Sequence, residues 1–438
     1  MPDSLQFAIT NTTDSNEVYA YVSGIAIQHN GQRCLMKANG RDLYFPSSPS
    51  TILQPLAEDC AIPLGPSGNT INITIPQIAG GRLWFSVNGK LTFLLNPGPA
   101  LVEPSVLNPS DPNAHVDFGF CEFTLNNDQL YANISYVDFV PRLPIAISLE
   151  NADGSVERVA GMGPDGLDRI CDALRAQASR DGRPWDKLVV QHEGRSLRAL
   201  NSTHGNAVGA SFDGYFEPYV EKVWQKYRHD TCRIDTQAGP GVLQGRINHK
   251  DEFVIGDEAF SKPNTADILG CNSGPFTTGP LATRNAIIPR LAAAFVRSTL
   301  LCETEHPSHP RTFFKEDPTN HYARIVHECQ KDGKGYAFAY DDVQPDGGDD
   351  QSGKVNGGAP TLFRVVVGGR GGGGDEAAPR QQQQSQQQSQ PPPIPANKPS
   401  MQQQQSGQAA QTPPPIPGGK PAHRGLRGHF NELTQKFL

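Results

Sequence analysis

Alternating apolar and polar positions predict strands along the first third of the chain. Two long runs, Val116–Leu125 and Tyr131–Val140, alternate aromatic, β-branched or Cys residues with small or polar ones. Shorter runs, broken by Gly, Pro and Asn, precede them at Gln6–Thr10, Val18–Ile27, Ile71–Ile78, Arg82–Val87 and Lys90–Leu95. A period of two is typical of strands with one buried face, so we expect a β-sandwich or barrel over residues 1–150.

Helical spacing replaces this alternation in the middle of the chain. The candidate helices are Gly166–Arg180, Phe216–Arg228 and Asn285–Leu301, the last with a buried stripe at Ala292–Val296, and Leu188–Gln191 is a candidate strand. We therefore expect a mixed α/β part over residues 151–332. If residues 333–370 return to the β part, with a closing strand at Thr361–Val367, the α/β part is an insertion. The fold class expected is then a β-rich α+β protein.

The last seventy residues differ from the rest in composition. The 438-residue chain has 44 Gly and 38 Pro, and Gln runs and two PPPIP segments follow Gly371. Such a segment buries too little apolar surface to order itself, so we expect a disordered tail from 371 to 438. PPPIP segments are of the kind that SH3 or WW domains bind, and a flexible spacer is the alternative.

Charge and cysteine spacing exclude several classes of function. A net charge of −7 argues against nucleic acid as a partner, and no stretch is apolar enough to span a membrane. The eight cysteines include no C-x-x-C pair and no metal-like spacing with His, so we expect no metal and no cofactor. Met1–Asn11 lacks the basic and apolar regions of a secretory signal. We also expect a monomer.

Glu122 and Asp138 are single carboxylates within the two long β-rich runs. A charge in apolar surroundings costs free energy unless it is paired, solvated or used, and two acids are the minimum for a glycosidase. If a two-residue turn at Asn127–Asp128 joined the strands, Glu122 would face Asn133, and Asp138 would lie roughly 17 Å from it. Joint catalysis therefore requires a longer loop centred near Leu130. The alternative is that both acids lie at the rim of an exposed sheet face.

The segments C-E-F-T-L-N and I-S-Y-V-D-F-V around these acids resemble the thaumatin-like pattern. Together with Gly81–Asn113 and the YAFAYDD segment at Tyr336–Asp342, they resemble glycoside hydrolase family 64, the β-1,3-glucanases with a thaumatin-like domain, over about Leu5 to Gly369. One departure from thaumatin itself is Phe139, where Gly follows the Asp. The resemblance implies a thaumatin-like β domain and a polysaccharide substrate.

By the same resemblance, Glu122 matches the general acid and Asp138 the general base of an inverting hydrolase. Thr124, Asn126, Asp111, Asp341 and Asp342 match positions around the substrate. Glu103 is a further candidate for the substrate site, with a solvated loop acid as the alternative. The family also implies secretion, although no signal peptide is visible. In a secreted protein the even-numbered, dispersed cysteines would be expected to form disulfides. A non-catalytic β-glucan-binding or defence-type thaumatin-like protein remains the competing interpretation.

Overall fold

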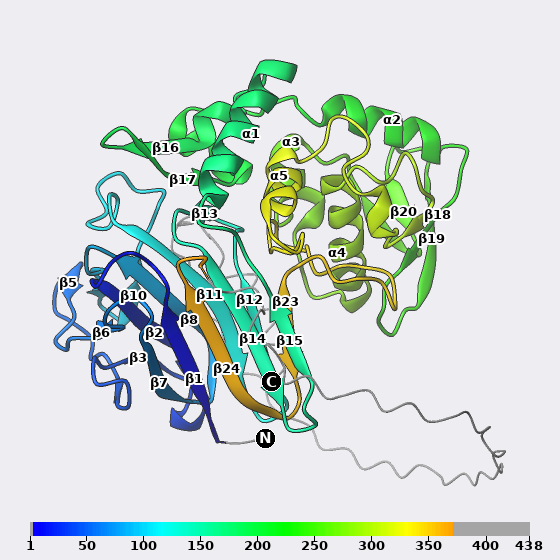
Figure 1. Ribbon diagram of the computed structural model, residues 1–438. Coiled ribbons are helices and arrows are strands. Elements are labelled where there is room, and N and C mark those ends of the chain that lie inside the picture. The colour runs from blue at the N-terminus through cyan, green and yellow to red at the C-terminus, as the bar shows by residue number, and fades with distance from the viewer. Residues whose placement is uncertain (1–2, 371–438) are drawn as a thin grey trace, which may run out of the picture. The chain divides into compact units, whose positions relative to one another are not determined.

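The computed structural model describes residues 3–370, so the expected tail and both PPPIP segments lie outside the described residues. Strands predominate over helices, as the sequence predicts (Figure 1). The strands of the two largest sheets are β1 (Ser4–Asn11), β2 (Val18–Ala26), β3 (Gln32–Met36), β4 (Leu43–Tyr44), β6 (Ile62–Pro63), β7 (Thr70–Pro76), β8 (Ile78–Val87), β11 (Asp117–Leu125), β12 (Leu130–Ile134), β14 (Ile145–Asn151), β15 (Val156–Val159), β23 (Lys354–Gly357) and β24 (Pro360–Val367).

These strands form two sheets that pack face to face. One sheet has the order β15-β14-β24-β1-β7, and the other has the order β23-β12-β11-β8-β2-β3-β4, with β6 paired to β2. Alternate side chains of each sheet enter a shared core. Phe7 on β1 contacts Phe123 on β11 and Phe363 on β24, with ring centroids 5.2 and 4.8 Å apart. The alternation in the sequence therefore has its expected cause, a sandwich core.

The first and last described strands are paired in the same sheet. β1 runs parallel to β24, with Phe7 opposite Phe363, and β24 continues the sheet to β14. The predicted closing strand Thr361–Val367 is thus confirmed. This sheet therefore includes a strand, β24, that comes after the helical part of the chain.

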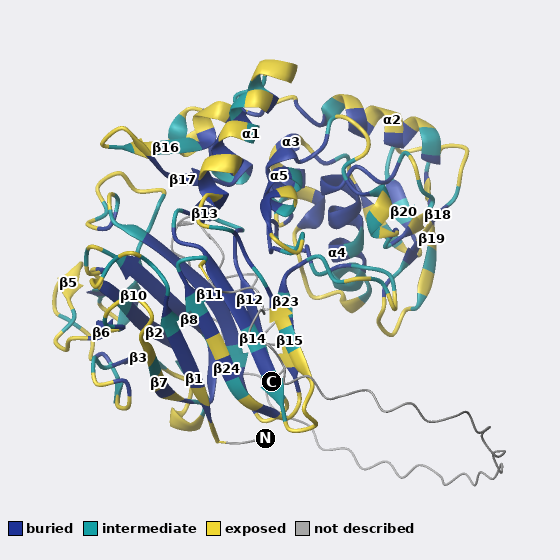
Figure 2. Ribbon diagram, in the orientation of Figure 1, coloured by how far each residue is buried: buried dark blue, intermediate teal, exposed yellow. Residues whose placement is uncertain are grey.

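Both faces of β11 are buried, whereas the sequence predicts one exposed face (Figure 2). The face away from the sandwich core is covered by an aromatic cluster that includes Trp84, Phe93 and Phe120. Small strands lie over this cluster: β5 (Gln54–Pro55), β9 (Leu94–Asn96) and β10 (Ala100–Val102). The predicted run Lys90–Leu95 is mostly irregular. Its side chains Leu91 and Phe93 pack inward and are part of the aromatic cluster.

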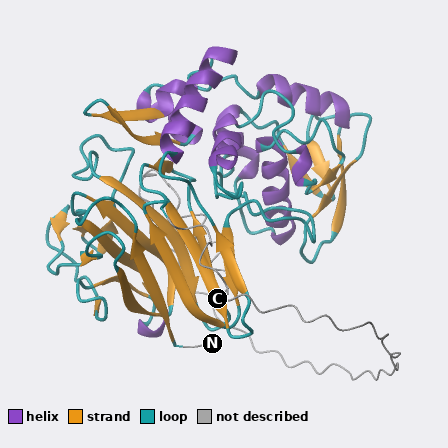
Figure 3. Cartoon of the chain, in the orientation of Figure 1, coloured by secondary structure: helices purple, strands orange, loops and turns teal. Residues whose placement is uncertain are grey.

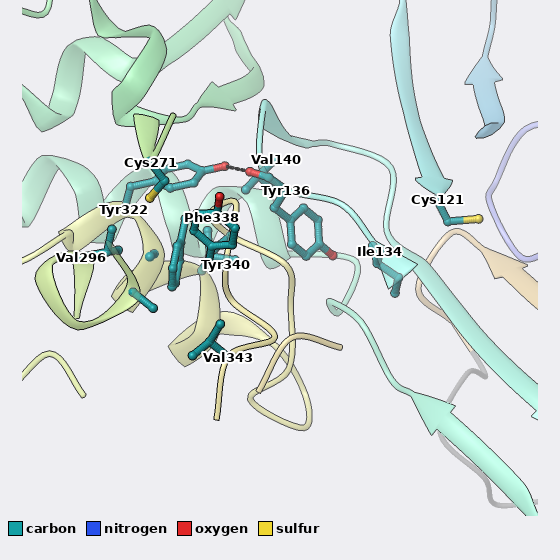
Figure 4. Packing of buried hydrophobic residues seen from close by; sticks show 14 of the residues in the cluster. Cys121, Ile134, Tyr136, Val140, Cys271, Val296, Tyr322, Phe338, Tyr340 and Val343 are labelled. Carbon is teal, nitrogen blue, oxygen red and sulfur yellow. Dashed lines mark hydrogen bonds between the residues drawn. The ribbon is translucent and has the colours of Figure 1, made fainter. Parts of the chain in front are cut away.

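The predicted second strand, Tyr131–Val140, is wrong as a single strand. β12 ends at Ile134, and β13 (Phe139–Pro141) pairs in another sheet with β17 (Arg195–Leu200), which pairs with β16 (Val189–His192). Between them the chain bends, because its backbone groups bond to distant residues. Tyr136 N donates to Tyr336 O at 2.8 Å, and the Tyr322 hydroxyl donates to Tyr136 O at 2.7 Å (Figure 4).

The helices all fall between residues 166 and 329 of the described chain (Figure 3). The α-helices are α1 (Gly166–Asp181), α2 (Glu217–Tyr227), α3 (Thr265–Gly270), α4 (Ala282–Val296) and α5 (His321–Cys329). The 3₁₀ turns η2 (Trp185–Leu188), η3 (Ser202–Val208), η4 (Gly274–Phe276) and η5 (Pro310–Thr312) lie in the same range, and η1 (Ile27–His29) follows β2. The three predicted helices are confirmed as α1, α2 and α4. No helix in residues 3–370 is long and apolar enough to cross a membrane.

A further five-stranded sheet accompanies these helices. Its order is β21-β20-β19-β18-β22. The strands are β18 (Cys232–Asp235), β19 (Val242–Ile247), β20 (Phe253–Ile255), β21 (Glu258–Phe260) and β22 (Glu305–His306). This part of the chain thus contains both helices and strands, as the mixed pattern of the sequence predicts.

The expectation of bridged cysteines is not supported. All eight cysteines are free, and every one except Cys302 is buried. They are dispersed along the chain from β3 to α5. Free Cys is among the residues most often buried, and the seven buried side chains serve as small apolar core residues without bridges.

Candidate active site

Glu122 lies in the middle of β11, in the sheet whose outer face carries the aromatic cluster. Alternation sends Cys121 and Phe123 into the sandwich core, so Glu122 points the other way, with Phe120. Its neighbours across the sheet are Arg82 on β8 and Asn133 on β12. The residue is only 5% exposed.

Burial decides the protonation of Glu122. Desolvation raises the pKa of its carboxyl to about 7; the Arg82 charge opposes this rise, and the negative charges of Asp138 and Glu103 add to it. Glu122 therefore retains its proton in weakly acidic solution, where an ordinary Glu has lost it. A buried acid that holds a proton near neutral pH can donate it.

Arg82 joins Glu122 to a second carboxylate. Its Nε donates to Glu122 Oε1 at 3.2 Å, and its Nη1 donates to Glu103 Oε2 at 2.8 Å. The guanidinium also lies over the rings of Trp84 and Phe120, at 5.4 and 5.0 Å from their centroids. Glu103, for which a solvated loop acid was the alternative interpretation, is a partly buried ion-pair partner.

Asp138 lies in the bend just before β13, outside the sheet that holds Glu122. Its Oδ1 lies 3.1 Å from His204 Nε2, and its backbone oxygen accepts from Asn201 N at 2.9 Å. Its side chain is 19% exposed, so it is more open to water than Glu122.

The expected longer loop between the two acids is wrong. Leu125 pairs with Leu130, so Glu122 faces Asn133, the register that predicted a wide separation. That estimate assumed one straight strand, but the chain leaves the sheet after Ile134. The Asp138 charge still contributes to the raised pKa values of Glu122 and Arg82, so the bend keeps Asp138 within electrostatic reach of both.

Three polar side chains alternate on β12 and just beyond its end, beside Glu122. Tyr131, Asn133 and Ser135 lie on one face, as the two-residue period requires. The Tyr131 hydroxyl, Asn133 Oδ1 and Ser135 Oγ are buried and make no hydrogen bond of normal geometry within the described residues. Buried polar atoms are nearly always bonded, so these oxygens have hydrogen-bonding capacity that the described residues do not use.

Three predicted site residues take part in local structure. Thr124 Oγ1 accepts from Gly80 N at 3.3 Å, two residues along β11 from Glu122. Asn126 Oδ1 accepts from Asp128 N and Gln129 N, and so forms the turn between β11 and β12. Asp111 organises the loop that follows Glu103 through its carboxylate. That group accepts from Ser105 N at 3.1 Å and Asn113 N at 2.8 Å.

The structure separates the roles of Asp341 and Asp342. Asp341 is 1% exposed and binds Arg297 and His327, each at 3.0 Å. Burial would raise its pKa, but the charges and hydrogen bonds of these partners hold the pKa below its ordinary value. This enclosed carboxylate holds Arg297 and His327 in place, and contact of Asp341 with substrate stays a prediction. Asp342 is partly exposed, accepts from the Tyr336 hydroxyl at 3.0 Å, and acts electrostatically on Tyr131.

Sequence reasoning missed Arg82, His204, Asn133 and Ser135. Arg82 carried a signal, a single basic residue in a predicted strand that is otherwise apolar. His204 carried none, because its partner is 66 residues away. Within the described residues, no group of three or more His, Cys, Asp or Glu side chains is placed to hold a metal ion.

A proton-bearing acid near a second, more exposed carboxylate is the arrangement that defines the glycoside hydrolase class of site. The model of the β-1,3-glucanase family, glycoside hydrolase family 64, matches residues 3–367. The chain belongs to this family.

Individual relatives agree with this family assignment. A glucan endo-1,3-beta-glucosidase of Arthrobacter sp. (strain YCWD3) and one of Cellulosimicrobium cellulans are each 32% identical over 358 residues, covering 78% of this chain. The chain spans 62% of the length of each of these relatives.

Solved structures agree as well. A laminaripentaose-producing β-1,3-glucanase in complex with laminaritetraose superposes with a TM-score of 0.74 at 30% identity, covering 84% of this chain and 99% of that one. A family 64 β-1,3-glucanase domain from Clostridium beijerinckii has a TM-score of 0.66 at 22% identity, covering 83% of this chain and 98% of that one, and shows the shared fold.

The structural role of Asp341 can be tested by stability. Asp341→Asn removes the carboxylate that Arg297 and His327 bind, so the free energy of unfolding should fall by about 3–5 kcal/mol, as when one partner of a buried ion pair is lost. Asp342→Asn is the matched control, and its loss of one hydrogen bond should cost about 1 kcal/mol. Denaturant unfolding measures both. A stable Asp341→Asn protein with weakened substrate binding would instead support the substrate role.

Proposed function

We propose that this chain hydrolyses β-1,3-glucan of the laminarin or curdlan type and releases short laminari-oligosaccharides. The observation that carries the proposal is the buried Glu122, whose pKa of about 7 suits a proton donor, near the more exposed Asp138. The family and the relatives named glucan endo-1,3-beta-glucosidase support the substrate class. The related structure that holds laminaritetraose supports an oligosaccharide-binding site in the shared fold.

In the proposed mechanism Glu122 is the general acid and Asp138 the general base. The bond between the anomeric carbon and the leaving oxygen breaks as that oxygen takes the Glu122 proton. A water molecule attacks the anomeric carbon from the opposite face and gives a proton to Asp138. Each turnover leaves Glu122 ionised and Asp138 protonated, and exchange with solvent restores both. Such an inverting pair has carboxyl groups about 6.5–9.5 Å apart.

Further residues have proposed roles around this pair. The unpartnered oxygens of Tyr131, Asn133 and Ser135 are suited to sugar hydroxyls, because a bound glucan would satisfy their missing hydrogen bonds. His204 orients Asp138 through the contact of 3.1 Å. Thr124 remains a candidate substrate contact, since it lies on the same face of β11 as Glu122.

Asp342 is proposed as a candidate substrate contact beside Tyr131. Asn126 and Asp111 are proposed to support the site through the turn and the loop that they hold. These roles place the candidate residues in two groups, one that contacts substrate and one that keeps the contacting residues in position.

A non-catalytic β-glucan-binding protein is the competing function. It would need the same polar surface, but it would gain nothing from a carboxyl group whose proton is retained to about pH 7. Burying an acid costs free energy, and binding alone does not repay that cost. The state of Glu122 therefore favours the enzyme.

The domain organisation is proposed on the same terms. We infer a thaumatin-like β domain made of residues 1–150 and 333–370, with residues 151–332 inserted as a mixed α/β domain. The parallel pairing of β1 with β24 supports this division, because it returns the chain to its first sheet after the last helix. A polymeric glucan outside the cell is the proposed substrate, so secretion and a monomeric enzyme remain our expectations.

Replacing either acid should remove most of the activity. Glu122→Gln loses the transferable proton and Asp138→Asn loses the proton acceptor, so we expect kcat on laminarin to fall about 10²- to 10⁴-fold in each. Release of reducing sugar measures this. Glu150→Gln is the control, because Glu150 accepts from Arg364 at 2.6 Å on the other sheet. Near-wild-type turnover in either acid variant would remove that acid from the mechanism.

The stereochemistry of the product tests the role of Asp138. A water that attacks opposite the leaving group converts a β-linkage into an α-anomer, so proton NMR should detect the α-anomer first, before mutarotation. An initial β-anomer would mean that Asp138 forms a covalent intermediate, and the proposed base would instead be a nucleophile.

A further inference from the structure

The contact between Arg82 and Glu122 poses a chemical problem. A guanidinium within hydrogen-bond distance favours the ionised form of a carboxyl group and typically lowers its pKa by about 1–3 units. A general acid must instead arrive at the reaction with its proton. Arg82 contacts Glu122 at 3.2 Å and is itself shielded from solvent. Something must therefore limit the effect of Arg82 on Glu122.

We propose that Glu103 is a positioning residue that binds the charge of Arg82, so that Glu122 remains a protonated acid in the free enzyme. This inference rests on the proposed function. It gives Glu103 a role that needs no contact with substrate.

Charge balance in the buried cluster carries the argument. Arg82 brings one positive charge, which neutralises one carboxylate, and a second ionised carboxylate would leave an uncompensated charge out of water. Glu103 is better placed than Glu122 to be the ion-pair partner of Arg82. Its contact with Arg82 is the shorter one, 2.8 Å against 3.2 Å, and its side chain is 24% exposed, against 7% for Glu122. Glu103 is therefore the ion-pair partner of Arg82, and Glu122 is the one that stays neutral.

A chain of hydrogen bonds holds Glu103 in place. Ser23 Oγ donates to Glu103 Oε1 at 2.8 Å, and Trp84 Nε1 donates to the same Ser23 oxygen at 3.0 Å. Both bonds arise from strands of the sheet that carries Glu122. On the far side, Asp111 fixes the loop after Glu103 through Ser105 N. The carboxylate is thus held toward Arg82 rather than free in solvent.

The other titratable groups near Glu122 do not replace Glu103. Asp138 adds a negative charge from the bend before β13, and Tyr131 on β12, opposite Thr124, feels the charge of Glu122. Cys121 precedes Glu122 on β11 but points into the sandwich core. Lys354 on β23, opposite Asn133, is paired with Asp350 at 4.0 Å. Apart from Glu122 itself, Glu103 is the carboxylate that contacts Arg82 directly.

The test is the pH profile of kcat/KM on laminarin. Its alkaline limb reports ionisation of Glu122, since activity is lost as pH rises through the pKa of the acid. Glu103→Gln keeps the shape and removes the charge, so the limb should move about one unit to lower pH, with the plateau at low pH retained. Glu103→Asp keeps the charge, so its alkaline limb should lie close to that of the wild type. An unmoved limb in a folded Glu103→Gln protein would overturn the proposal.

A second variant keeps the test decisive if Glu103→Gln does not fold. Arg82→Gln removes the cation, so the limb should move to higher pH, opposite to the first variant, and a limb that stays or falls would contradict the proposal. Glu150→Gln, another Glu bonded to an Arg, is the matched control and should leave the limb in place.

Failure of the proposed function would look different. An enzyme without activity on β-1,3-glucan, or an active Glu122→Gln variant, would refute the function itself. A Glu122-dependent enzyme whose alkaline limb ignores Glu103 would refute only this inference.

Discussion

Burial of one carboxyl group between two apolar layers is the constraint on which the rest of the site depends. β11 is covered on one side by the sandwich core and on the other by the aromatic cluster, and Glu122 lies between them. Water is excluded there, so the neutral form of the acid is favoured. The sheet pairing that fixes Glu122 also fixes Arg82 opposite it, and with Arg82 the whole ion-pair chain.

The two acids differ because the chain places them in different surroundings. Glu122 is held in the middle of a sheet, while Asp138 lies in a bend with His204 and more exposure. Acid and base catalysis by two carboxyl groups requires that their surroundings differ. The bend exists because Tyr322 and Tyr336, both distant in sequence, bind the backbone of Tyr136. Packing far from β11 thus determines where Asp138 lies.

Much of the fold could be predicted from periodicity, and less of the site. Alternation identified the sandwich strands, and helical spacing identified α1, α2 and α4, because both patterns arise from local geometry and burial. The break after Ile134 could not be predicted, since residues 131–140 are rich in aromatic and β-branched residues on both sides of it, and the interactions that bend them come from residues 322 and 336. Glu122 and Asp138 were found as isolated acids in apolar runs. The enclosure of Asp341 by Arg297 and the pairing of Asp138 with His204 are long-range contacts that no local pattern encodes.

Direct titration of Glu122 tests whether burial keeps this carboxyl group protonated. Carbon NMR of enzyme labelled at the Glu carboxyl carbons, with the Glu122 signal assigned by its absence from Glu122→Gln, reports the protonation of this group without substrate. Because desolvation outweighs the attraction of Arg82, we expect Glu122 to titrate with a pKa of about 7. A midpoint of about 4.3, the ordinary value for Glu, would show that Glu122 is ionised at neutral pH and would contradict its role as the acid.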